Sequence, residues 1–82
     1  MEHYLILARS ITAAQRIRDT LEKAGIRASL QRAPTGLSPK GCSYAVRIGT
    51  ARWQEAAALT RQLGLVPFSI FAAVNGTYRE VK

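Results

Sequence analysis

The sequence predicts an α+β domain in which two helices cover one face of a four-stranded antiparallel sheet. Three observations support this fold class. Runs typical of strands alternate with two stretches of helical periodicity in the order β-α-β-β-α-β. Both helical stretches end in a glycine followed by an aliphatic residue, Gly25-Ile26 and Gly64-Leu65. The chain has 82 residues, which is room for one domain, and we place that domain over residues 1–82.

The first part of the chain predicts a strand, a helix and a second strand. Residues 4–8 form a continuous apolar run, which is typical of a central strand buried on both faces. Ser10 and Thr12 are candidate N-caps for the helix that follows, and Thr12 has capping-box spacing to Gln15. Residues 27–32 alternate between apolar and polar side chains and predict a half-exposed strand. The helix should bury one apolar stripe, formed by Ala14, Ile17, Leu21 and Ala24.

The second part repeats this order after a loop over residues 33–42, whose prolines and glycines exclude regular structure. Residues 44–48 alternate and predict a third strand, and residues 68–74 predict a fourth. Asn75-Gly76 is a strong hairpin signal, so residues 77–81 should form a short additional C-terminal strand. Between the third and fourth strands, Thr50 should cap a second helix over residues 51–63. The inner side of that helix should carry Trp53, Ala56, Ala57, Thr60 and Leu63.

This element order predicts a ferredoxin-like fold with the strands arranged 4-1-3-2 and right-handed crossovers. Along the first strand, Tyr4, Ile6 and Ala8 point to one face of the sheet, and Leu5 and Leu7 point to the other. Two helices can cover one of these faces, so the apolar side chains of the other face would stay exposed in a monomer. We therefore expect a homodimer in which sheets pack face to face, or in which edge strands join. In an alternative monomer, residues 77–82 would fold over this face.

The composition is consistent with an anionic partner and equally with a charged surface that keeps the protein soluble. The net charge is +7, from 12 Lys and Arg against 5 Asp and Glu, and the basic residues are dispersed along the chain. RNA-recognition modules of this topology stack bases on aromatic residues of the two central strands. Here those strands offer Tyr4 and Tyr44 alone, which disfavours nucleic acid as the partner. The apolar runs are too short to span a bilayer and the N-terminus lacks a basic signal-peptide start, so we expect a cytoplasmic protein with no membrane contact.

The sequence offers little for an enzyme. It contains no glycine-rich phosphate loop, and its carboxylates form no evident acid/base pair. His3 is the single histidine and Cys42 the single cysteine, a set too small for a structural zinc site within one chain. We therefore expect a protein without metal or cofactor that is not a catalyst with its own turnover.

Cys42 is the residue with the most distinctive chemistry. It follows Lys40-Gly41 and precedes Ser43, where the loop enters the third strand. The charge of Lys40 would favour the thiolate, and Gly41 would let backbone N–H groups approach the sulfur. The competing interpretation is an inert, half-buried cysteine, because free cysteines are among the most buried residues. The residues alone leave both interpretations open.

Several segments nevertheless match the pattern of one known family: Tyr4-Leu5-Ile6-Leu7, Ala24-Gly25-Ile26, Pro34, Leu37-Ser38, Cys42 and Arg47. On these residues the chain resembles the putative selenium/sulfur carrier protein-like family of small bacterial domains. The resemblance extends to about residue 74. The chain departs from the family's Ser-x-x-Cys-Gly pattern, because Ser38 lies one residue further from Cys42 and Ser43 replaces the glycine.

The resemblance implies that Cys42 accepts a persulfide or selenide from a donor protein and passes it to an acceptor. Lys40 and Arg47 would stabilise the anion, with Gly41 and Ser43 flanking the sulfur. Two other functions remain open from the residues. One is a dimeric small-molecule-binding or regulatory module of ferredoxin-like type, with the loop over residues 34–41 as a lid on an anionic ligand. The other is a protein-interaction domain in which Cys42 is inert.

Overall fold

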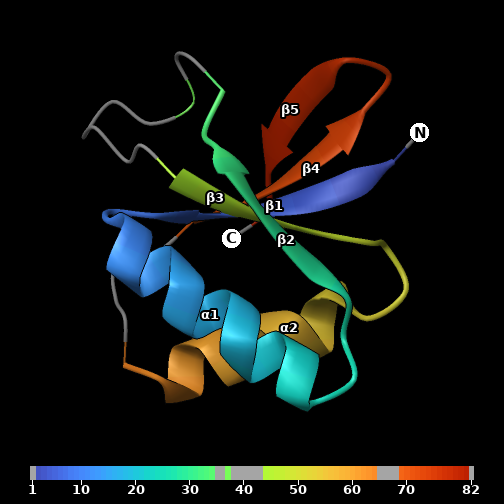
Figure 1. Cartoon of the computed structure of the whole chain (residues 1–82). Helices are drawn as coiled ribbons and strands as arrows, with labels where there is room; N and C mark the ends of the chain where they lie inside the picture. Colours follow the sequence, from blue (N-terminus) through green and yellow to red (C-terminus); the bar gives the residue numbers. More distant parts are fainter. Residues whose placement is uncertain (1, 35–36, 38–43, 65–68, 82) are drawn as a thin grey trace.

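The computed structural model describes residues 2–34, 37, 44–64 and 69–81. Its five strands form one antiparallel sheet in the order β2-β3-β1-β4-β5, and both helices lie on one face of that sheet (Figure 1). The fold class is therefore α+β. The elements are β1 (His3–Ala8), α1 (Ile11–Lys23), β2 (Ala28–Arg32), β3 (Tyr44–Ile48), α2 (Trp53–Gln62), β4 (Ser69–Val74) and β5 (Thr77–Glu80).

The hairpin strand predicted after Asn75-Gly76 is confirmed as β5, but it belongs to the sheet, so the predicted count of four sheet strands is wrong. β5 pairs with β4 from Val74–Thr77 to Phe71–Glu80 and is part of the sheet. The cause is the tight turn at Asn75 and Gly76, whose φ angles of 52° and 77° are those of a type I′ hairpin. Such a turn leaves no residues between the strands that could separate them. The order β4-β1-β3-β2 of the first four strands is the expected one.

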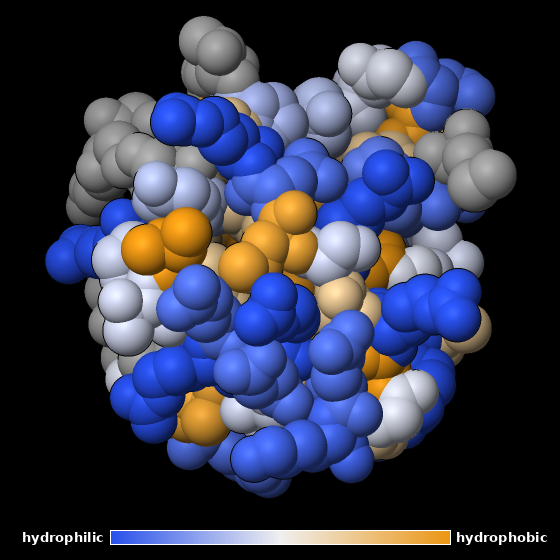
Figure 2. Space-filling model, in the orientation of Figure 1, coloured by the Kyte–Doolittle hydropathy of each residue, from blue (hydrophilic) through white to orange (hydrophobic). Residues whose placement is uncertain are grey.

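The main core lies between the sheet and the helices. The predicted α1 stripe is confirmed at Ala14, Ile17 and Leu21, which are buried, and Ala24 packs against them at the edge. Tyr4 stacks on Trp53 of α2, with ring centroids 4.8 Å apart and planes 12° apart. We call the buried residues between the sheet and the helices the helix-face cluster. Its largest members from the sheet are Ile6, Val46, Ile48 and Ile70. The outer surface over the helices is mostly hydrophilic (Figure 2).

Helix α1 begins and ends as its sequence signals indicate. The Ser10 side chain accepts a hydrogen bond from the Ala13 N–H at 3.1 Å, so Ser10, and not Thr12, is the N-cap. At the other end, the Ile26 N–H donates to the Leu21 carbonyl at 2.9 Å. Gly25 supplies the left-handed conformation that this C-terminal motif requires, with φ of 83°.

Helix α2 starts later than predicted. Its first residue is Trp53 and its N-cap position is Arg52, so the expectation that Thr50 caps a helix from residue 51 is wrong. The Arg52 guanidinium donates to the Gly25 carbonyl at 3.0 Å and the Ala24 carbonyl at 3.2 Å, and it also forms an ion pair with Glu55 at 2.8 Å. These contacts fix the turn before α2 against the end of α1. Arg52 therefore joins the two helices at their adjoining ends.

The opposite face of the sheet, which we call the open face, is less exposed than the sequence predicts. Leu5, Leu7 and Ala45 are at most 1% exposed and form a second cluster. Ala33, Leu37 and Phe71 pack against that cluster, so part of the cover comes from residues that follow β2. The prediction that a monomer leaves the apolar side chains of one sheet face exposed is wrong for this reason. The C-terminal segment is not the expected cover, because Val81 packs against the helix-face cluster instead.

Candidate functional site

The candidate site is the connection between β2 and β3, which holds Cys42. Lys40, Gly41, Cys42 and Ser43 lie outside the described residues, whereas Arg47 on β3 is described. The described residues that flank Cys42 are Leu37 on its N-terminal side and Tyr44 on its C-terminal side. The geometry of the site can therefore be built from the parts of the sheet where this connection starts and ends.

The connection leaves β2 over the open face. The Leu37 N–H donates to the Pro34 carbonyl at 3.4 Å, which forms a turn. The Leu37 side chain packs against the cluster of Leu5, Leu7 and Ala45. This contact explains how the apolar open face is covered within one chain, and it attaches the segment before Cys42 to the sheet.

The chain rejoins the sheet at Tyr44, beside several positive groups. Tyr44 pairs with Ala8 on β1 and with Arg32 on β2. Arg9 follows Ala8, and both Arg9 and Arg32 are exposed and form no ion pair within the described part of the chain. The positive charge therefore gathers at the end of the sheet that receives the Cys42 connection.

Helix α1 adds to this potential. It starts at Ile11, just after β1 ends, and its first turn lies at the same end of the sheet as the start of β3 (Figure 1). The N-terminus of a helix carries a partial positive charge. The first turn of α1 is described throughout and contains no acidic residue that would neutralise this charge. A thiolate, persulfide or selenide anion would be stabilised in such surroundings.

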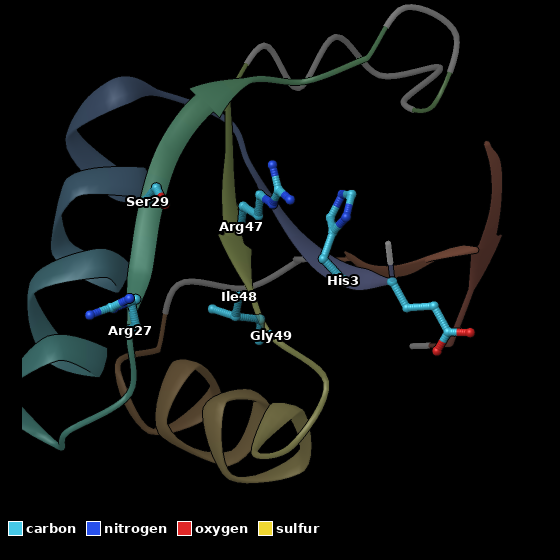
Figure 3. A pocket seen from close by; sticks show the side chains of 7 residues that line it. His3, Arg27, Ser29, Arg47, Ile48 and Gly49 are labelled. Atoms are coloured by element: carbon cyan, nitrogen blue, oxygen red, sulfur yellow. The ribbon is translucent and has the colours of Figure 1, made fainter. Parts of the chain in front are cut away.

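Arg47, which the family resemblance implies as an anion-stabilising residue, lies on the face of β3 opposite to the Tyr44 side chain. It pairs with Leu5 on β1 and with Ser29 on β2, so its side chain lies on the open face. It also lies three residues beyond Tyr44, which is about 10 Å along a strand. Arg47 instead lines a hollow with His3, Arg27 and Ser29 (Figure 3).

Sequence reasoning did not single out Arg9 and Arg32, which lie beside Tyr44 where the chain rejoins the sheet. Arg32 is twelve positions before Tyr44 in the sequence, and the antiparallel pairing of β2 with β3 places them opposite each other. The signal that could have found Arg32 is the predicted strand order, which already made these strands neighbours. Arg52 was also missed, because its bonds to the Ala24 and Gly25 carbonyls depend on how two helix ends meet.

Other chemistry is scarce in the described part of the chain. No group of three His, Cys, Asp or Glu side chains is placed there to hold a metal ion. No helix among the described residues has the length and hydropathy needed to cross a membrane. The Arg52 guanidinium lowers the pKa of Glu55, chiefly by hydrogen bonding, and the same bond raises the pKa of Arg52. This pair serves the helix junction and lies away from the connection between β2 and β3.

These features define a small α+β domain whose single cysteine lies in a connection that returns to an electropositive end of the sheet. Over residues 3–71 the chain matches the family described as Putative Se/S carrier protein-like. The match spans most of the chain, and the protein belongs to this family. The turn at Asn75-Gly76 and strand β5 lie beyond the matched residues. No curated protein and no solved structure matches the chain.

Proposed function

We propose that this protein is a cytoplasmic sulfur or selenium carrier that uses Cys42 as its carrying group and has no catalytic turnover of its own. The observation that carries the proposal is the family match, which runs from residue 3 to residue 71 and so includes Cys42. We propose as well that the α+β fold of this protein is of the ferredoxin-like type. The electropositive end formed by Arg9, Arg32 and the first turn of α1 supports it, because the carried group is an anion.

The transfer is a thiol exchange in two steps. The Cys42 thiolate attacks the terminal sulfur of a persulfide on a donor protein, the donor's S–S bond breaks, and the donor thiolate leaves. Cys42 then holds a persulfide. An acceptor thiolate attacks the terminal sulfur, the bond to Cys42 breaks, and the Cys42 thiolate is restored. Each step exchanges one bond for another, so no external oxidant or reductant is consumed. Selenium would be carried in the same way as an S–Se bond.

The neighbours of Cys42 have separate proposed roles. Lys40 and Arg32 supply positive charge, and Gly41 and Ser43 supply backbone N–H groups beside the sulfur. Arg32 takes the role first expected of Arg47, because Arg32 lies opposite Tyr44 in the sheet register. Stabilising the anion lowers the pKa of the thiol and keeps the attacking form populated near neutral pH.

The test combines mass and reactivity. After incubation with a small-molecule persulfide donor, the intact protein should gain the mass of one sulfur atom, and Cys42→Ser should gain none. Iodoacetamide labelling of the native protein across pH should show a midpoint below the free-thiol value of about 8.5. Arg32→Gln should raise this midpoint, whereas Arg16→Gln on the exposed side of α1 should leave it unchanged. Labelling that requires denaturation would contradict the carrier function.

We also propose that the protein acts as a homodimer joined through β5. This strand ends the described sheet, pairs with β4 and with no other strand among the described residues, and is exposed at all four positions. Unpaired backbone groups along an edge strand can pair with a second chain. Tyr78 on this strand is 37% exposed and, with Ile11, is one of two large hydrophobic residues exposed in the described part of the chain.

A further inference from the structure

We propose that the hollow beside Arg47 is a binding site for a small oxyanion, of the size and charge of sulfate or phosphate. The hollow has a volume of about 250 Å³. Its lining includes Glu2, His3, Arg27, Ser29, Arg47 and Gly49. We call it the anion pocket. Its central residue, Arg47, lies three residues after Tyr44 on β3. The binding of an anion in this pocket does not depend on the proposed carrier function.

The sheet register brings these residues together from three strands or strand ends. Ser29 on β2 and Arg47 on β3 are direct partners, so their side chains lie on the same face. Tyr4 pairs with Ile48, which places His3 and Gly49 in the next row of that face. Figure 3 shows the Arg47 guanidinium and the His3 ring projecting from adjacent strands on the same side of the sheet.

The charge of the pocket suits an anion. Neither Arg27 nor Arg47 forms an ion pair or a side-chain hydrogen bond within the described part of the chain. Among the described residues that line the pocket, Glu2 is the single carboxylate, so the two guanidinium groups outweigh it. In Figure 3 the Arg27 side chain points away from Arg47. Arg47 is therefore the central contact, and Arg27 adds positive charge at the rim.

The donor groups match a tetrahedral oxyanion. A guanidinium presents a planar fork of N–H groups that can bind two oxygens of one anion. The Ser29 hydroxyl, opposite Arg47 across the strands, can donate to a third oxygen. Organic ligands of drug size usually occupy about 300–1,000 Å³. The hollow is just below this range, and it is large enough for a compact anion.

Gly49 keeps one side of the pocket open. A Cβ built at Gly49 meets no atom within 4 Å, so the space beside this residue is empty of protein. A side chain added there would project into the pocket without colliding with the core. Gly49→Leu therefore offers a way to fill the pocket while leaving every charge in place.

The experiment is a titration of the full chain with sodium sulfate and with inorganic phosphate, followed by NMR chemical shifts or calorimetry. Sodium chloride at matched ionic strength serves as the reference, and Cys42→Ser in all samples removes thiol chemistry. We expect both oxyanions to shift the resonances of Ser29, Arg47 and Gly49. Arg47→Gln should weaken binding by about tenfold, the loss of one charge-assisted contact. Gly49→Leu should abolish binding, and Arg16→Gln, a charge-matched control on α1, should preserve it.

Three results would overturn the proposal. Equal weakening by Arg16→Gln and Arg47→Gln would show that the anions respond to net charge alone. Undiminished binding to Gly49→Leu would place the anion elsewhere. Binding of a short single-stranded RNA with no binding of sulfate or phosphate would identify a nucleic-acid surface instead. Sulfur loading of the Arg47→Gln protein with Cys42 intact is measured in parallel, and it should be unchanged, which separates this site from the carrier function.

Discussion

Leu21 shows how a single buried side chain supports the packing of helix on sheet. It is 0% exposed and belongs to the helix-face cluster. We predict that Leu21→Ala lowers the free energy of unfolding by about 2–5 kcal/mol, because it removes buried methyl groups and leaves a cavity. Urea denaturation measures this change. Glu22→Ala, on the exposed side of the same turn, should change stability by less than about 0.5 kcal/mol. An equally small loss for Leu21→Ala would refute the assigned helix face.

At the scale of residues, the sequence predicts side-chain direction well where a period is present. The predicted alternation along β1, with Ile6 on one face and Leu5 and Leu7 on the other, is confirmed by the two clusters, and the structure places Ile6 on the helix side. Alternation along a strand is a local property, so it can be read from a few residues. Arg52 could not be assigned in this way. Its contact with Gly25 joins residues 27 positions apart and depends on the placement of both helices.

At the scale of elements, the junction of α1 with α2 rests on an exposed ion pair. Arg52 donates to both Glu55 oxygens, at 2.9 and 2.8 Å, and this lowers the pKa of Glu55 in the folded chain. A carboxyl group whose pKa is lowered by folding stabilises the folded state above its unfolded pKa, and this stabilisation disappears as the pH falls through the lowered value. The pair therefore stabilises the junction at neutral pH and ceases to do so in acid.

We predict that Glu55→Gln lowers the melting temperature slightly at pH 7, since exposed ion pairs contribute little. The difference between the two proteins should shrink as the pH falls through the lowered pKa of Glu55, because the carboxyl of the native protein then becomes neutral as well. Thermal denaturation of both proteins from pH 7 to pH 3 measures this. High salt at pH 7 should also reduce the difference. A difference that stays constant over the whole pH range would contradict the role assigned to the pair.

The elements with strong local signals are the ones that the sequence predicts correctly. Gly25 and the Asn75-Gly76 turn adopt the positive φ angles that their positions require, and β3 has its predicted bounds at residues 44 and 48. The start of α2 was predicted two residues too early, because Thr50 resembles a cap while Arg52 fixes the turn from outside. The cover of the open face was also missed, since the contact of Leu37 with the second cluster has no periodic signal.

The candidate site shows the same limit. The family resemblance directed attention to Cys42, and the family match over residues 3–71 confirms that resemblance. The basic residues near Tyr44 could not be found from their distance to it along the sequence, because strand pairing decides which of them lie beside it. Pairing places Arg32 opposite Tyr44 and places Arg47 with Ser29 in the anion pocket. Two basic residues that look equivalent in the sequence thus belong to different ends of the sheet.

At the scale of the whole molecule, the burial of Leu5 and Leu7 alters the case for self-association. Face-to-face packing of two sheets would bury little additional apolar surface, because these side chains are already covered within one chain. Association through the edge of the sheet is still favoured, because it would pair the free backbone groups of the edge strand. β5 has a partner on one side and none on the other within the described sheet, and each of its residues is exposed. The dimer that we propose therefore extends the sheet from one protomer into the next.

The register of this dimer can be predicted from the charges on β5. A two-fold pairing centred on Arg79 would set two like charges against each other, which destabilises a strand pair. Centring on Tyr78 places the tyrosines of the two protomers opposite each other and sets Arg79 against Thr77 of the partner subunit. Aromatic cross-strand pairs are favourable, and two-fold closure is the commonest symmetry of homo-oligomers. Both helix layers then lie on the same side of the extended sheet.

We predict that the native protein sediments and scatters light as a dimer, and that Tyr78→Lys converts it to a monomer near 9.0 kDa. The substitution puts a charge at the centre of the proposed interface, where it would face its own copy, and Tyr78 belongs to neither hydrophobic cluster of the monomer. Ile11→Lys is the matched control. It makes the same chemical change at the other large exposed hydrophobic residue of the described chain, on α1 and away from β5, so it should leave the dimer intact. Light scattering over a concentration series measures both variants. A native protein that stays near 9.0 kDa at high concentration would refute the dimer, and a dimer that survives Tyr78→Lys but not Ile11→Lys would place the interface at the start of α1.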